Sequence, residues 1–199
     1  MFHRFSVCVC LMVWGALAGC ASSPPSSFYK LNALTEPHQN LQVQVDESCL
    51  SLGIGPVTIP AYLDRSQIVT LLSQNKLQLA DFHQWSEPLK YSVARVLSEN
   101  LSKLLCTEYV VTFPLQGNRP IQFWITVDIS HFEGTFGGQA QLSAHWIIHQ
   151  GEDKKLVMTK KSDYRDTLEG GSYEALVSVM STLLEALSRD IAQGIQSAL

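Results

Sequence analysis

The sequence predicts an α+β protein, a single two-layer domain in which a mostly antiparallel sheet packs against two main helices. Several segments alternate apolar and polar residues with a period of two, as half-buried strands do. Two longer segments repeat apolar residues every three or four positions, as amphipathic helices do. The 199-residue chain is long enough to give one such domain a substantial core.

The strands are predicted from this alternation and from turn residues. Residues 41–45 (LQVQV) alternate strictly, and residues 50–59 continue as an extended piece that Gly55 and Pro56 bend. Six later segments share a strand-like composition or period, and they are residues 68–72, 76–79, 109–113, 121–129, 140–148 and 156–165. The polar residues 73–75 and the glycine-rich residues 134–138 are expected to turn two hairpins.

The first helix is predicted in the middle of the chain. Apolar residues recur at helical spacing from Leu89 to Leu104. Ser86 is the expected N-cap, and Glu87 and Pro88 suit a first turn.

The second helix is predicted at the end of the chain, after two glycines and with Ser172 as its N-cap. A long apolar stripe runs from Tyr173 to Ile195. The opposite face is poor in Lys and Arg, which a helix lying on a membrane surface would carry. We therefore expect this helix to pack on the sheet.

Residues 1–19 have the pattern of a secretory signal peptide. A weakly basic head precedes an uncharged run that is shorter than the about 20 apolar residues of a membrane span. The run ends in Leu17-Ala18-Gly19-Cys20, which resembles the lipobox of bacterial lipoproteins. That resemblance implies cleavage before Cys20, a diacylglyceryl thioether on its sulfur and acylation of the new amino terminus by a chain such as palmitate. The alternative is a plain signal peptide followed by a chance cysteine.

Residues 20–27 are interpreted as the lipidated Cys20 and a flexible tether, and residues 28–199 as the folded domain. Fully extended, the tether reaches roughly 25 Å. Two or more acyl chains hold a protein on a membrane without spanning it. Ala21 follows the cysteine, whereas lipoproteins retained at the inner membrane carry Asp at that position. Resemblance to sorted lipoproteins therefore favours the outer membrane, with the domain facing the periplasm.

The charge balance excludes some partners. The chain carries 14 basic and 18 acidic side chains, for a formal net charge of −4, and no stripe of Lys and Arg. Such a chain is a poor candidate for nucleic acid or for anionic lipid headgroups. Contact with the membrane is therefore assigned to the lipid anchor.

Two cysteines remain after Cys20, and they are Cys49 and Cys106. In the oxidising periplasm a disulfide between them is one interpretation, and it would stabilise the fold by roughly 4 kcal/mol. The other interpretation is two separate buried thiols.

Several stretches share their order and spacing with one known family. They are Phe28-Tyr29-x-Leu31, Gly55-Pro56-Val57-x-Ile59-Pro60-x-Tyr62-Leu63-Asp64-Arg65-x-Gln67-Ile68-Val69, Trp85-x-Glu87-Pro88-Leu89 and Leu97-x-x-Asn100-Leu101. Together with the lipobox they resemble the PqiC/YmbA family of ABC-transport auxiliary lipoproteins along nearly all of the chain after the signal segment.

The resemblance implies a subunit of an intermembrane lipid transport system that maintains envelope integrity. It implies docking to an MCE-domain protein of the PqiB type, which bridges the envelope. The chain has no phosphate-loop motif, so nucleotide hydrolysis belongs to another subunit. A homo-oligomeric ring is an attractive hypothesis, because a lipid conduit needs a wider hole than one small domain offers. The alternative function is a stand-alone carrier that holds an acyl chain in its own cavity.

Four side chains are candidates for partner contact, and they are Tyr62, Arg65, Trp85 and Phe136. Tyr, Trp and Arg are enriched at interface hot spots. Each also has a structural alternative: a turn for Tyr62 and Arg65, packing under the first helix for Trp85, and a folded-back plug for Phe136.

Enzyme activity is not expected. His145 and His149 share a face of a predicted strand but lie roughly 13 Å apart there, so no metal site is predicted. No G-x-S-x-G nucleophile motif is present in the sequence. No cofactor is expected beyond the covalent lipid.

Overall fold

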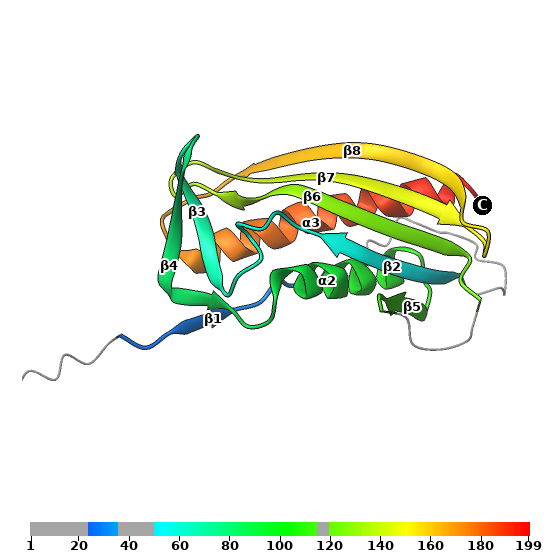
Figure 1. The fold of residues 1–199 in the computed structure, drawn as a ribbon, viewed down its shortest axis with the longest axis horizontal. Coiled ribbons are helices and arrows are strands. Elements are labelled where there is room, and N and C mark those ends of the chain that lie inside the picture. The colour runs from blue at the N-terminus through cyan, green and yellow to red at the C-terminus, as the bar shows by residue number, and fades with distance from the viewer. Residues whose placement is uncertain (1–23, 36–49, 115–119) are drawn as a thin grey trace, which may run out of the picture.

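An eight-stranded sheet curls over two helices that lie against one of its faces (Figure 1). The computed structural model describes residues 24–35, 50–114 and 120–199. The strands are β1 (Ser27–Tyr29), β2 (Ser51–Thr58), β3 (Gln67–Ser73), β4 (Lys76–Trp85), β5 (Tyr109–Thr112), β6 (Phe123–Gly134), β7 (Gln139–Gln150) and β8 (Lys155–Thr167). The helices are α2 (Leu89–Leu104) and α3 (Tyr173–Gln196). The predicted α+β class is confirmed.

The sheet is mixed, although its longest ladders are antiparallel. The strand order is β1-β4-β3-β6-β2-β5, and β7 and β8 continue from β6. The β6–β7, β7–β8 and β3–β4 ladders are antiparallel, as predicted. Pairs β1–β4, β2–β5, β2–β6 and β3–β6 are parallel. Parallel neighbours need long crossovers, and the segment containing α2 supplies one between β2 and β5.

The core lies between the sheet and the two helices. Leu184, Leu187 and Ile191 of α3 are fully buried, as the predicted apolar stripe requires. Gly194 lets the last turns of α3 approach the sheet closely, because a Cβ there would lie 2.9 Å from Ile148 Cδ1. The helix thus packs on the sheet, as expected.

The two predicted helix caps had different outcomes. Ser172 caps α3 as predicted, and its hydroxyl accepts a hydrogen bond from the Ala175 amide at 3.1 Å. The prediction for Ser86 is wrong, because α2 begins at Leu89 with Pro88 as its N-cap residue. The Ser86 amide instead donates to the Tyr29 carbonyl, which ties β1 to the end of β4.

A β-bulge in β6 changes which residues face the helices. The register with β7 shifts between Ile129 and His131, where β6 carries one extra residue. Beyond the bulge Phe132 points into the core, and Glu133 lies on the opposite face of the strand. The bulge therefore aims a carboxylate at the segment that covers this end of the sheet.

Some predictions fall on residues that the structure does not describe. They are the signal segment 1–19, Cys20, the strand at 41–45 and Cys49. Among the residues that are described, neither helix has the length and apolar character to cross a membrane.

Candidate functional site

The turn of residues 60–66 lies between two hollows in the surface. The amides of Leu63 and Asp64 both donate to the Pro60 carbonyl, and the buried Leu63 side chain pins the turn to the core. Tyr62 lines the hollow on one side of the turn, and Arg65 lines the hollow on the other side. The motif that carries the family resemblance therefore shapes both hollows.

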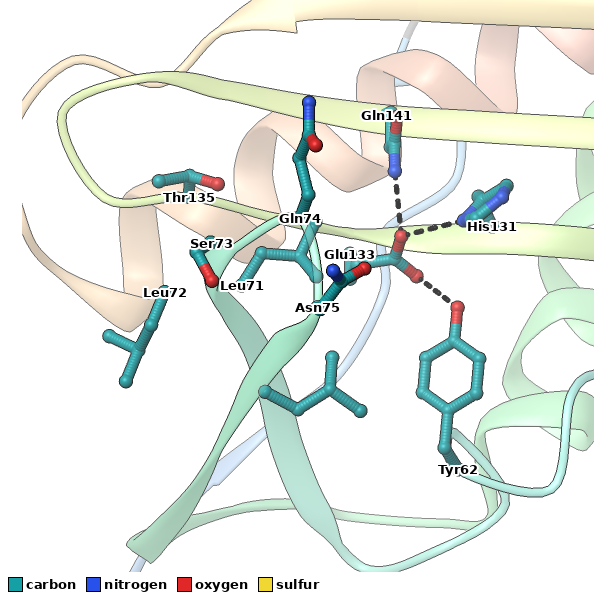
Figure 2. Close-up of a pocket in the computed structure, with 11 residues that line it drawn as sticks. Tyr62, Leu71, Leu72, Ser73, Gln74, Asn75, His131, Glu133, Thr135 and Gln141 are labelled. Atoms are coloured by element: carbon teal, nitrogen blue, oxygen red, sulfur yellow. Dashed lines mark hydrogen bonds and ion pairs between the residues drawn. The ribbon is translucent and has the colours of Figure 1, made fainter.

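The first hollow, here called the hairpin groove, lies between the β3–β4 hairpin and the end of β6 (Figure 2). Its volume is about 580 Å³. The residues that line it are Tyr62, Leu71, Leu72, Ser73, Gln74, Asn75, Leu77, His131, Glu133, Thr135 and Gln141. Three leucines from the hairpin form one wall, and polar side chains form the rest.

A buried carboxylate, Glu133, is at the centre of the polar part. Its side chain is 1% exposed, and both oxygens accept hydrogen bonds. Oε2 accepts from the Tyr62 hydroxyl and the Phe132 amide, each at 2.9 Å. Oε1 accepts from Gln141 Nε2 at 2.7 Å and lies 3.0 Å from His131 Nδ1 (Figure 2). These contacts supply the partners that a buried charge requires.

The Glu133 network fixes the turn to the sheet. Burial, the hydrogen bond to Glu133 and the negative charge of that carboxylate all raise the pKa of Tyr62 well above its ordinary value. The phenol therefore stays protonated and remains a donor at neutral pH. Because all four contacts of the carboxylate are intramolecular, we interpret Tyr62 as a residue that holds the turn in place.

The hairpin carries exposed leucines beside this network. Leu72 is 52% exposed, Leu77 is 39% exposed and Leu79 is 41% exposed. The hairpin stands away from the layer that the helices cover (Figure 1). Large apolar side chains grouped on a projecting element typify surfaces that bind another molecule.

The second hollow, here called the turn pocket, has a volume of about 340 Å³. It is lined by Asp64, Arg65, Ser66, Trp85, Ser86, Glu87 and Pro88. Both of its carboxylates are paired outside the pocket, Asp64 with Lys90 at 3.1 Å and Glu87 with Arg95 at 3.0 Å.

Two predicted contact residues, Arg65 and Trp85, meet in the turn pocket. Arg65 makes no ion pair with any described residue, and its buried Nε has no hydrogen-bond partner among them. Trp85 is only 6% exposed and belongs to the core, so its packing role is the one observed. Arg65 is thus the member of this pair that is available to a partner.

Phe136, the fourth candidate, lines neither hollow. It packs edge-on against Tyr173 with ring centroids 5.0 Å apart. Tyr173 in turn stacks on His83 at 4.1 Å, and the Tyr29 hydroxyl shares a hydrogen bond of 2.7 Å with His83 Nδ1. Phe136 is therefore half-buried in an aromatic cluster at the start of α3, which matches its folded-back alternative.

The disulfide stays one interpretation, since Cys49 lies outside the described residues. Cys106 is exposed just after α2, with φ of 50°, so the alternative of a buried thiol is wrong for Cys106. His145 lies on β7 and contacts Thr159 Oγ1 at 2.9 Å. The described residues contain no group of three His, Cys, Asp or Glu side chains placed to hold a metal ion.

Sequence reasoning missed Glu133 and the exposed leucines. Glu133 follows the regular alternation of residues 121–129 by four residues, and its type alone predicts an exposed side chain. Its burial depends on the one-residue bulge that decides which face it occupies. The leucines did leave a signal, since Leu71, Leu72, Leu77 and Leu79 are more apolar than a small edge hairpin requires.

Known proteins match this chain in sequence over most of its length. Residues 29–192 match the family model described as ABC-type transport auxiliary lipoprotein component. The intermembrane transport lipoprotein PqiC of Escherichia coli K12 is 28% identical over 186 residues, covering 90% of this chain and 92% of PqiC. PqiC of Shigella flexneri gives the same identity and coverage.

Solved structures share the fold. A crystal structure of an uncharacterized protein matches with a TM-score of 0.70 at 20% identity, covering 86% of this chain and 99% of that chain. A protein of Xanthomonas campestris matches with a TM-score of 0.68 at 10% identity, covering 83% and 92%. At these identities the likeness concerns the fold alone.

Proposed function

This chain belongs to the family of ABC-type transport auxiliary lipoprotein components, and we propose that it is the outer-membrane-anchored, periplasmic subunit of a PqiABC-like lipid transport system. Its general role as a transport auxiliary lipoprotein follows from the family. In the finer proposal, Cys20 carries the lipid and the domain docks an MCE-domain protein of the PqiB type to the outer membrane. That bridge maintains envelope integrity.

The exposed leucine wall of the hairpin groove is the observation that carries the docking proposal. Leu72 and Leu77 lie exposed on the hairpin, beside a turn that the buried Glu133 network holds to the sheet. Exposed apolar side chains with a polar rim have the anatomy of a protein interface. Arg65, free of ion pairs with described residues, adds a hot-spot side chain on the other side of the turn.

The proposal also concerns assembly. Several copies arranged as a homo-oligomeric ring would give the partner a wider opening than one domain provides. A monodisperse monomer of the lipidated protein in detergent, at any concentration that still binds the partner, would remove the ring from the proposal.

The test is capture of the partner from crosslinked envelopes. The tagged, lipidated protein is purified after crosslinking, and the bound proteins are identified by mass spectrometry. We expect an MCE-domain protein, reduced at least about tenfold by Leu72→Ser with Leu77→Ser, because each apolar anchor in an interface contributes on the order of 1–2 kcal/mol.

Leu156→Ser is the matched control. Leu156 is 58% exposed on β8, so its loss removes a similar side chain outside the groove. Equal loss of the partner in both variants would show that the groove has no special part in docking. Capture of no MCE-domain protein by the unaltered protein would contradict the docking proposal itself.

A stand-alone lipid carrier is the second candidate, because a volume of about 580 Å³ is within the range of ligand sites. The exposure of the groove to solvent argues against it. Leu72 in its wall is 52% exposed, whereas a carrier site would bury most of the surface of an acyl chain.

Lipid analysis separates the two functions. The detergent-free, unlipidated domain is purified and extracted, and bound lipid is quantified by mass spectrometry. The docking function predicts far less than one phospholipid or fatty acid per domain. About one lipid per domain, lost in Leu72→Ser with Leu77→Ser, would favour the carrier.

A further inference from the structure

The end of the domain from which the N-terminal tether leaves is unusually apolar. Nine large hydrophobic side chains are strongly exposed among the described residues, and five of them lie on β1, β3 and β4. Those five are Phe28, Leu72, Leu77, Leu79 and Phe82. Leu72 and Leu77 line the groove described above and Leu79 lies beside them on the hairpin, which leaves two phenylalanines without a role.

Phe28 and Phe82 lie on one face of the sheet. Phe28 pairs with Gln84 in the parallel β1–β4 ladder, and Phe82 precedes Gln84 by two residues on the same strand. The pairing of β4 with β3 is irregular between Leu79 and Gln84, but Asp81 and His83 both act on Tyr173, so Phe82 between them points the other way. The two rings therefore share a face, with Cα atoms roughly 8 Å apart. Phe28 is 65% exposed and Phe82 is 37% exposed.

The neighbouring residues of opposite parity, Tyr29 and His83, contact Tyr173 at the start of α3. Phe28 borders a hollow between β1 and the first turns of α3 but does not pack under the helix, since it is largely exposed. The phenylalanine pair therefore lies exposed at the edge formed by β1 and β4. Lys30, two residues beyond Phe28, is also exposed. Phe rings beside a lysine are side chains that interfacial segments use, with the rings entering the acyl boundary and the lysine facing the headgroups.

The position of the pair in the chain indicates what covers it. Phe28 follows the proposed lipidated Cys20 by eight residues, a segment that spans roughly 25 Å at most. The lipid anchor holds the domain within that distance of the bilayer. Even weak apolar contacts between the domain and the bilayer are therefore favoured, because the tether keeps the two at a high effective concentration. No other surface is brought so close by the chain itself.

We propose that Phe28 and Phe82 insert at the surface of the membrane that holds the lipid anchor and so fix the orientation of the domain on it. This inference rests on the proposed lipidation of Cys20. The two rings form a second, protein-based contact, which sets the sheet edge β1–β4 against the headgroups.

The experiment measures the depth of nitroxide labels on the lipidated protein. Single cysteines are introduced as Phe28→Cys, Phe82→Cys and, for comparison, Leu156→Cys, in a Cys49→Ser, Cys106→Ser background. The start of β8, which holds residue 156, lies at the opposite end of the molecule from β1 (Figure 1). Each protein is placed in vesicles of phosphatidylethanolamine and phosphatidylglycerol.

We expect labels at positions 28 and 82 to collide with a water-soluble relaxation agent at least about threefold less often than the label at position 156. A label at Gln84→Cys, on the same face, should be protected as well. That protection should disappear in Phe28→Ser with Phe82→Ser if the rings, and not the short tether, hold the contact.

Equal accessibility at positions 28, 82 and 156 in a protein whose Cys20 carries lipid would overturn this inference and leave the proposed function intact. Protection at position 84 that persists without the rings would also overturn it. A mass spectrum showing unmodified Cys20 in protein recovered from cells would overturn both proposals together.

Discussion

The helix-covered half of the sheet and the β3–β4 hairpin end are built from the same kind of strands but differ in what covers them. Along β6 and β7 the side chains facing α3 are almost all apolar and inaccessible, as with Trp146 and Ile148. At the hairpin end a buried carboxylate is held by Tyr62 and Gln141 while leucines face solvent. The first region stabilises the fold, and the second carries features that stability alone does not require.

The largest loss of stability is expected from a substitution in the helix-covered region. Trp146→Ala should destabilise the domain by about 3–5 kcal/mol, because it leaves a large cavity under α3 and removes the hydrogen bond from Nε1 to Ser162 Oγ at 3.1 Å. Chemical denaturation followed by circular dichroism measures the change. Leu156→Ala, an exposed side chain, should change the unfolding free energy by less than about 0.5 kcal/mol.

A smaller loss of stability is expected when the buried carboxylate at the hairpin end is removed. Glu133→Ala should cost about 2–3 kcal/mol, because it strands the Tyr62 hydroxyl, the Gln141 amide and the Phe132 backbone N–H. The exposed Glu99→Ala is the control. A Glu133→Ala variant as stable as the control would show that the network is not what holds the turn.

The third effect depends on pH. Asp190 Oδ2 accepts hydrogen bonds from Tyr164 at 2.6 Å, Lys160 at 2.8 Å and Ser162 at 3.0 Å. Burial alone raises the pKa of Asp190, but these partners outweigh it and lower the pKa below the ordinary 3.8.

A carboxyl with a lowered folded-state pKa contributes stability that is fully present above the unfolded value and is lost as pH falls through the folded value. Asp190→Asn should therefore be less stable than the unaltered protein by about 1–2 kcal/mol at pH 7, with the gap closing below about pH 4. Urea unfolding between pH 2 and pH 7 tests this. A gap of constant size across that range would refute the assignment.

The smallest effect on stability is expected for the two groove leucines, whose replacement should reduce capture of the partner most. Leu72→Ser with Leu77→Ser should change the unfolding free energy by less than about 1 kcal/mol, since both side chains are already exposed in the folded state. Differential scanning calorimetry checks this. A large loss of stability would mean that the leucines support the hairpin and are not a free binding surface.

The same contrast explains which parts of the structure could be predicted from the sequence. The alternation in residues 121–129 and 140–148 and the stripe of α3 reflect burial against one continuous layer, so a local pattern was sufficient. The parallel pairing of β2 with β5 and β6 depends on contacts between distant segments, which no local pattern encodes.

The candidate site was less predictable than the fold. Tyr62 and Arg65 were identified as candidates, but that they line two different hollows follows from the three-dimensional path of the turn. Glu133 lines the groove because β6 carries a bulge of one residue. Ser86 is not the N-cap because α2 begins only after Pro88. Both outcomes depend on a shift of one or two residues, which patterns of hydrophobicity do not resolve.

The most direct test of the docking claim is photo-crosslinking in living cells. A photoreactive amino acid replaces Leu72 in the groove wall or, as the control, Leu156 on β8. The account predicts that irradiation links position 72, and not position 156, to an MCE-domain protein. Crosslinks from position 72 to lipid alone, or equal yields of the protein adduct from both positions, would contradict it.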